Sequence, residues 1–126
     1  MWLNLGVIGA GAAVGAWARW LLGLALNPLL GALPLGTLAA NLIGGYLMGV
    51  ALAFMGAWPE MPMALRLLLT TGFLGGLTTF SSFSGEVFQM FQRQQIGWAL
   101  AAIAVHVCGS LLMTALGWWS YLAITR

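Results

Sequence analysis

The sequence contains almost no charge. Its 126 residues include two glutamates, four arginines and no lysine, and charged residues make up 5% of the chain. A soluble domain carries about 25% charged residues, so this chain cannot cover a water-soluble surface. Hydrophobic residues make up 62% of the sequence, and its mean hydropathy is +1.00. The composition therefore predicts an integral membrane protein.

Other absences exclude several classes of function. Cys108 is the only cysteine, so the chain forms no internal disulfide. The arginines are scattered and make no basic patch for nucleic acid. The Gly75-Gly76 pair lacks the lysine of a phosphate-binding loop, and no catalytic triad is suggested. We therefore expect neither an enzyme nor an organic cofactor.

Four long apolar segments follow one another along the chain. They cover residues of about 2–26, 35–57, 63–91 and 96–124. Each has the roughly 20 apolar residues that a helix needs to cross the hydrocarbon core. The first segment lacks a basic start and a clear cleavage site, so we interpret it as a span and not as a signal peptide. The sequence predicts an all-α membrane protein with four transmembrane helices in one domain, residues 1–126, and both termini on one side.

The arginines give this bundle no clear orientation. The side with more Lys and Arg is normally cytoplasmic. Arg66 and Arg126 fall on the side of the termini, whereas Arg93 lies on the other side and Arg19 lies nearer to that side. This balance leaves two alternatives open. Either the chain inserts in both orientations, which permits an antiparallel homodimer, or hydrophobicity or a partner fixes one orientation.

Small residues recur at helical spacing. Glycines four residues apart let helix backbones approach closely in lipid. The pairs are Gly11/Gly15, Gly45/Gly49 and Gly72/Gly76. They predict tight helix packing inside the bundle and favour association with a second copy.

Three polar groups lie inside apolar spans, where each needs a partner or a function. Asn41 either joins two helices through a hydrogen bond or donates its amide hydrogens to an anion. Arg19 either snorkels to the interface or sets a positive potential at a vestibule. Glu86, the only acid within a span, can pair with an arginine, line a water-filled mouth or carry protons.

The fourth segment carries His106, Ser110 and Thr114 four residues apart, on one face. A lone histidine here is more often a hydrogen-bonded packing residue than a ligand, and no second histidine or carboxylate lies at metal-binding spacing. The two hydroxyl groups either bond to carbonyls one turn earlier or offer donors to a pore.

The third segment contains a stretch, Thr71–Ser84, that does not suit a regular membrane helix. It holds adjacent glycines, Gly75 and Gly76, each of which costs a helix about 1 kcal/mol relative to alanine. We expect the helix to unwind within the run Gly75–Thr79 and a second half-helix to begin near Thr79. Unwinding frees carbonyl oxygens that suit a hard cation such as Na⁺, and N–H groups that favour an anion. The break is either a packing device or part of a permeation path.

Aromatic and hydroxyl residues follow the break. Phe80 and Phe83 lie one turn apart on one face. Rings at this spacing usually pack, but their positive edges can also contact a small anion. Ser81, Ser82 and Ser84 add hydroxyl donors, which lipid-facing packing does not favour. The serines therefore strengthen the interpretation as a permeation path.

The segment Gly72–Glu86, GFLGGLTTFSSFSGE, resembles the signature of the Fluc/CrcB fluoride channels. Three more segments are similar to that family, in the same order along the chain. They are GAWARW (Gly15–Trp20), PLGTLAANLIGGYLMG (Pro34–Gly49) and HVCGSLLMTALG (His106–Gly117). The resemblance covers essentially the whole chain.

The resemblance implies a channel of the bacterial inner membrane that passes fluoride passively and so reduces its toxicity. It implies an antiparallel, dual-topology homodimer with two pores and a central structural Na⁺, held by backbone carbonyls of Gly75 and Thr78. It places Arg19 at the aqueous vestibule, where we also place Glu86. A tyrosine that some members carry has no clear counterpart near Ala102–Val105. The implied pore residues are Asn41, Phe80, Phe83, Ser81, Ser82, Ser110 and Thr114.

Two other functions compete with the channel. A small multidrug-type proton-coupled transporter also has four helices and dual topology, and it needs a carboxylate deep in a span. Glu86 is the only candidate, and it lies past the break towards an end of its span. A structural subunit of a membrane complex would explain the glycines but not Asn41 and the serines.

Overall fold

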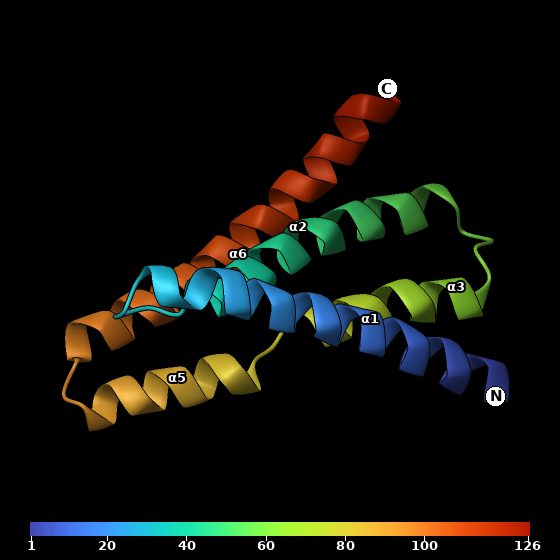
Figure 1. Ribbon diagram of the computed structural model, residues 1–126. Coiled ribbons are helices and arrows are strands. Elements are labelled where there is room, and N and C mark those ends of the chain that lie inside the picture. Colours follow the sequence, from blue (N-terminus) through green and yellow to red (C-terminus); the bar gives the residue numbers. More distant parts are fainter.

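The computed structural model describes all 126 residues, and every regular element in it is helical. The chain forms four long helical segments, and both of its termini lie at the same end of the molecule (Figure 1). The segments that are long and apolar enough to cross a membrane are Trp2–Leu29, Leu35–Ala57, Met63–Gln92 and Ile96–Thr125. The prediction of an all-α chain with four helices long enough to span a membrane is therefore confirmed.

The elements in chain order are α1 (Trp2–Leu26), a 3-10 turn η1 (Asn27–Leu29), α2 (Leu35–Ala57), α3 (Met63–Leu67), a π-helix η2 (Leu68–Leu74), α4 (Gly75–Leu77), α5 (Ser81–Gln92) and α6 (Ile96–Thr125). Helix α2 packs along α6, and α1 packs along η2 and α4. The C-terminal part of α6 diverges from the rest of the bundle (Figure 1).

The glycine pairs lie where helix backbones touch. A Cβ atom on Gly15 of α1 would overlap the Phe73 carbonyl, and one on Gly76 would overlap the Ala12 carbonyl. On the other side of the bundle, a Cβ atom on Gly49 of α2 would overlap the Thr114 carbonyl of α6. All six predicted glycines have such contacts, which confirms that they serve close packing within the chain.

The third span is broken, as predicted, but not at the glycines. Gly75 and Gly76 remain helical, and the helix ends only at Leu77. Thr78 is extended (φ −85°, ψ 159°), and the second half begins at Ser81 rather than near Thr79. The glycines stay helical because they serve packing. Gly76 leaves the space into which the α1 backbone fits, and it does not make the chain flexible there.

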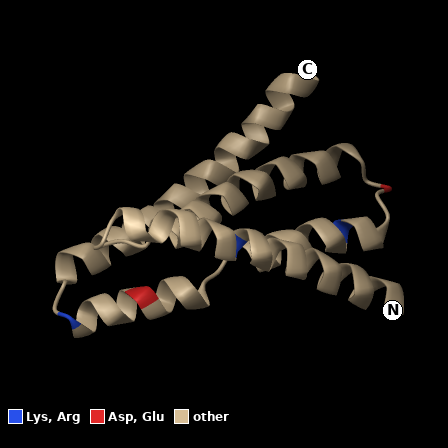
Figure 2. Cartoon of the chain, viewed as in Figure 1, with Lys and Arg blue, Asp and Glu red and all other residues tan.

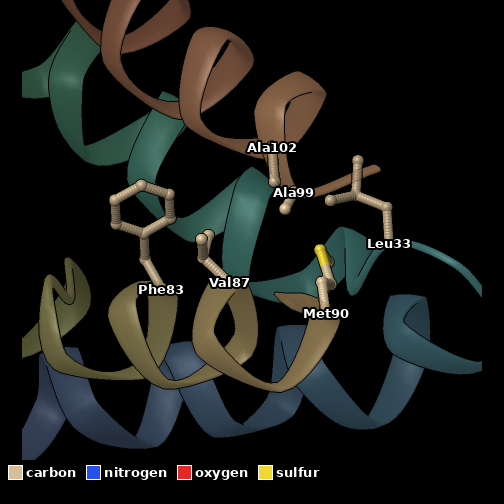
Figure 3. Close-up of a cluster of buried hydrophobic side chains, with 6 residues drawn as sticks. All are labelled: Leu33, Phe83, Val87, Met90, Ala99 and Ala102. Carbon is tan, nitrogen blue, oxygen red and sulfur yellow. The ribbon is translucent and has the colours of Figure 1, made fainter. Parts of the chain in front are cut away.

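Few side chains are buried. Only 21 of the 126 residues are, so most large apolar side chains face outward, as they do when lipid or a partner covers a protein. The charged groups are few and spread along the molecule without forming a patch (Figure 2). The larger core cluster joins α5 to α6, with Leu33 from the loop before α2 beside it (Figure 3). It consists of Leu33, Phe83, Val87, Met90, Ala99 and Ala102.

Candidate functional site

A groove of about 500 Å³ lies among α2, the broken third span and α6. It brings together seven of the predicted pore and cation-site residues, from three different spans. They are Asn41, Gly75, Thr78, Phe80, Phe83, Ser110 and Thr114. His106 lines the same groove. Since the break faces this groove, the unwound backbone adjoins a cavity and not lipid.

Asn41 holds the unwound backbone in both directions. The Thr79 N–H donates to Oδ1 of Asn41 at 2.8 Å, and Nδ2 of Asn41 donates to the Thr79 carbonyl at 3.0 Å. Nδ2 also lies 3.0 Å from Nδ1 of His106. The amide therefore has a protein partner for each of its two hydrogens, and it joins α2 to the break and to α6.

His106 is a packed, hydrogen-bonded side chain. It is 4% exposed, and its ring lies 4.4 Å from the Phe83 ring, centroid to centroid, at 31°. Its polar partner is Asn41. No group of three His, Cys, Asp or Glu residues lies together at metal-binding distances.

The two phenylalanines differ in burial. Their ring centroids lie 5.6 Å apart at 73°, an edge-to-face arrangement. Phe83 is 8% exposed and belongs to the core, whereas Phe80 is 77% exposed just before α5. Only Phe80 therefore presents most of its ring surface to the outside.

The hydroxyl residues separate into three environments. Oγ1 of Thr114 lies 2.9 Å from the carbonyl oxygens of both Gly45 and Ser110, so this hydroxyl donates to the backbone. Ser110 lines the groove. Ser82 does not line the groove, and its N–H donates to Oγ1 of Thr79 at 3.0 Å. Ser81 is exposed, with its hydroxyl 3.4 Å from that of Thr79.

A second pocket of about 380 Å³ holds the two predicted vestibule residues, Arg19 and Glu86, together with Ser82. Nε of Arg19 donates to the Gly76 carbonyl at 3.2 Å and so satisfies one of the carbonyls near the end of α4. Glu86 accepts from Thr37 at 2.8 Å. The two charged side chains thus have different hydrogen-bond partners.

Three polar partners were not predicted from the sequence. Thr79 is the backbone partner of Asn41, Thr37 is the partner of Glu86, and Asn27 accepts the Gly36 N–H at 2.7 Å. Thr37 precedes Asn41 by one helical turn in an otherwise apolar span, which was an available signal. The other two contacts depend on tertiary structure.

The backbone at the break offers carbonyl oxygens, which are the ligands that a hard cation needs. In a continuous helix the Thr79 N–H would donate to the Gly75 carbonyl, but here it donates to Asn41. Thr78 is extended, and both Gly75 and Thr78 line the groove. Their carbonyl oxygens are the type of ligand that hard cations prefer.

Comparisons with known proteins agree on one family. The family described as CrcB-like protein, camphor resistance (CrcB), matches residues 6–118. The fluoride-specific ion channel FluC of Aromatoleum aromaticum is 59% identical over 116 residues, which cover 92% of this chain and 88% of the relative. Proteins of the same name from Pseudomonas putida and Pseudomonas aeruginosa are 60% and 55% identical, covering 90% and 95% of this chain and 90% and 94% of the relatives.

Proposed function

The chain belongs to the CrcB family, and we propose that it is a fluoride-selective channel of the bacterial inner membrane. It passes fluoride passively and so keeps the cytoplasmic fluoride concentration low. The observation that carries this proposal is the groove, which gathers an amide, two phenylalanines and a hydroxyl track beside a broken helix.

The groove suits a small, strongly hydrated anion. A pore must replace the hydration of the ion with donors, yet hold the ion weakly enough to release it. We propose that Asn41, Phe80 and Phe83 line the path and that Ser81, Ser82, Ser110 and Thr114 extend it. Hydroxyl and amide donors with ring edges provide partial positive charge without a fixed cation.

Asn41 can serve the ion only by exchanging a partner. Both of its hydrogens already point to acceptors, the Thr79 carbonyl and Nδ1 of His106. Hydrogen bonds to an ionised acceptor are roughly twice as strong as neutral ones, so a fluoride ion competes well with the imidazole. We propose that the hydrogen facing His106 is the one that passing fluoride takes.

We further propose an antiparallel homodimer with two such paths. Three apolar side chains around the groove, Phe80, Val107 and Leu111, are exposed, and a second copy would cover them. Two copies of one groove give two paths. The even division of arginines between the two ends is compatible with insertion in both orientations.

The charged and carbonyl groups have separate roles in this proposal. Arg19 and Glu86 lie at the aqueous vestibule, where the arginine attracts the anion. The carbonyls of Gly75 and Thr78 would hold a structural Na⁺ at the dimer interface, where the cation would offset the partial negative charge of these oxygen atoms.

Growth of a bacterial strain that lacks its own fluoride export tests this proposal. Expression of the chain should restore growth in fluoride, whereas expression of Asn41→Asp, which puts a negative charge on the path, should not. Both proteins should be present in the membrane in equal amounts. Failure of the unchanged chain to restore growth contradicts the proposed function.

A further inference from the structure

The orientation of the Asn41 amide is dictated by the backbone that it binds. The Thr79 N–H can only donate and the Thr79 carbonyl can only accept. Oδ1 must therefore face the N–H and Nδ2 must face the carbonyl, as their distances of 2.8 and 3.0 Å indicate. A flipped amide would place donor against donor and acceptor against acceptor.

This orientation also dictates the state of His106. An amide nitrogen has no acceptor capacity, so Nδ1 of His106, 3.0 Å from Nδ2 of Asn41, must accept its second hydrogen. The imidazole is then neutral and carries its proton on Nε2. The ring is 4% exposed and packs on Phe83, and this contact restrains its position.

The charged groups of the neighbouring helices are engaged elsewhere. On α5 the Glu86 carboxylate accepts from Thr37, and on α1 the Arg19 guanidinium donates to the Gly76 carbonyl. The one titratable side chain on α2 is Tyr46, and Cys108 on α6 is exposed. Asn41 is thus the polar partner that the structure gives to His106.

We infer that His106 is a positioning residue that acts through Asn41. By accepting at Nδ1, it fixes the amide plane, and the amide in turn holds the Thr79 peptide between α4 and α5. Phe80 follows Thr79 directly, so the same contacts also determine the position of the exposed Phe80 ring. The flux consequence of this inference rests on the proposed channel function, whereas the tautomer does not.

The first part of the test uses nitrogen-15 spectroscopy of the full-length protein. His106 is the only histidine, so histidine labelling of a tag-free sample reports on this ring alone. We expect an unprotonated Nδ1 and a protonated Nε2, and a mixture of tautomers in Asn41→Ala. A proton on Nδ1 in the unchanged protein overturns the inference, whatever the protein transports.

The second part compares fluoride efflux from liposomes for two substitutions of similar size. His106→Asn keeps an acceptor where Nδ1 lies, and His106→Leu removes it. A hydrogen bond is worth about 1 kcal/mol, so we expect His106→Leu to slow efflux at least fivefold and His106→Asn to restore most of the loss. In an Asn41→Ala background, adding His106→Leu should have little further effect.

Other results contradict the inference in distinct ways. Equal efflux in His106→Asn and His106→Leu means that the ring acts by volume and not by its acceptor. Full additivity in the Asn41→Ala background means that His106 does not act through Asn41. If His106→Leu does not fold, the nitrogen-15 measurement of the tautomer and the fluoride efflux of His106→Asn still test the inference. Absence of fluoride efflux in the unchanged protein contradicts the proposed function and leaves the tautomer result standing.

Discussion

At the scale of single residues, the two phenylalanines differ in how much of each side chain belongs to the core. Phe83 is part of the core between α5 and α6 and packs against the His106 ring, so its ring has a structural role. Phe80 is 77% exposed and touches Phe83 edge to face. A functional effect at Phe80 therefore cannot be ascribed to a disturbed core.

We predict different outcomes for Phe80→Ile and Phe83→Ile. Phe80→Ile should reduce fluoride flux with little change in thermal stability, because its ring is outside the core of the chain. Phe83→Ile should reduce flux and also lower stability by about 1 kcal/mol, since its contact with the His106 ring is lost. Efflux assays and thermal unfolding in detergent measure the two quantities. Unchanged fluoride flux in both variants would show that the phenylalanine ring edges do not contribute to permeation.

A single substitution at Glu86 tests the competing hypothesis of a proton-coupled transporter. Glu86 accepts from Thr37 in the second pocket, away from the groove. We predict that Glu86→Gln still conducts fluoride. Neither the unchanged protein nor this variant should need a pH gradient for fluoride efflux. Efflux measured with and without an imposed gradient checks this. Flux that requires the gradient and disappears in Glu86→Gln would instead identify a proton-coupled transporter.

At the scale of the elements, the broken third span shows what the sequence could and could not predict. Low helix propensity in Thr71–Ser84 correctly indicated a break. Its position depends on Asn41, which lies 38 residues before Thr79 and replaces the helical partners of that peptide. The π-helix Leu68–Leu74 was not predicted either. Local propensity therefore locates a weak helix, whereas tertiary hydrogen bonds decide where it opens.

The close approach of α1 to the third span gives a prediction with a matched control. Gly15→Ala would place its Cβ atom on the Phe73 carbonyl and 2.6 Å from the Leu77 nitrogen. We expect a loss of about 1–3 kcal/mol, because rigid backbone cannot move aside easily. Gly9→Ala, on the same helix with no atom within 4 Å, should be neutral or stabilising. Thermal unfolding of the two variants compares them, and equal stability would refute the packing role.

At the scale of the whole molecule, the groove leaves the apolar side chains of Phe80, Val107 and Leu111 exposed in the single chain. The four spans could be predicted because length and apolar composition decide them. The groove could not, since it depends on how α2, α6 and the break come together. The sequence nevertheless indicated most of its polar lining, because amide, hydroxyl and broken-helix signals are conspicuous in apolar spans.

Cysteine labelling tests insertion in both orientations. Glu60 lies in the exposed turn between α2 and α3, and Cys108→Ser removes the only native thiol. In intact cells a membrane-impermeant maleimide should label roughly half of the Glu60→Cys chains, because the arginines give no orientation bias. Labelling of all chains or of none would show a single orientation.

The most direct test of fluoride selectivity is ion efflux from liposomes that contain the purified protein. Fluoride and chloride efflux are measured separately, with ion-selective electrodes and without a proton gradient. The groove of donors and ring edges predicts rapid fluoride efflux and far slower chloride efflux. Equal rates for the two ions, or no fluoride efflux at all, would contradict it.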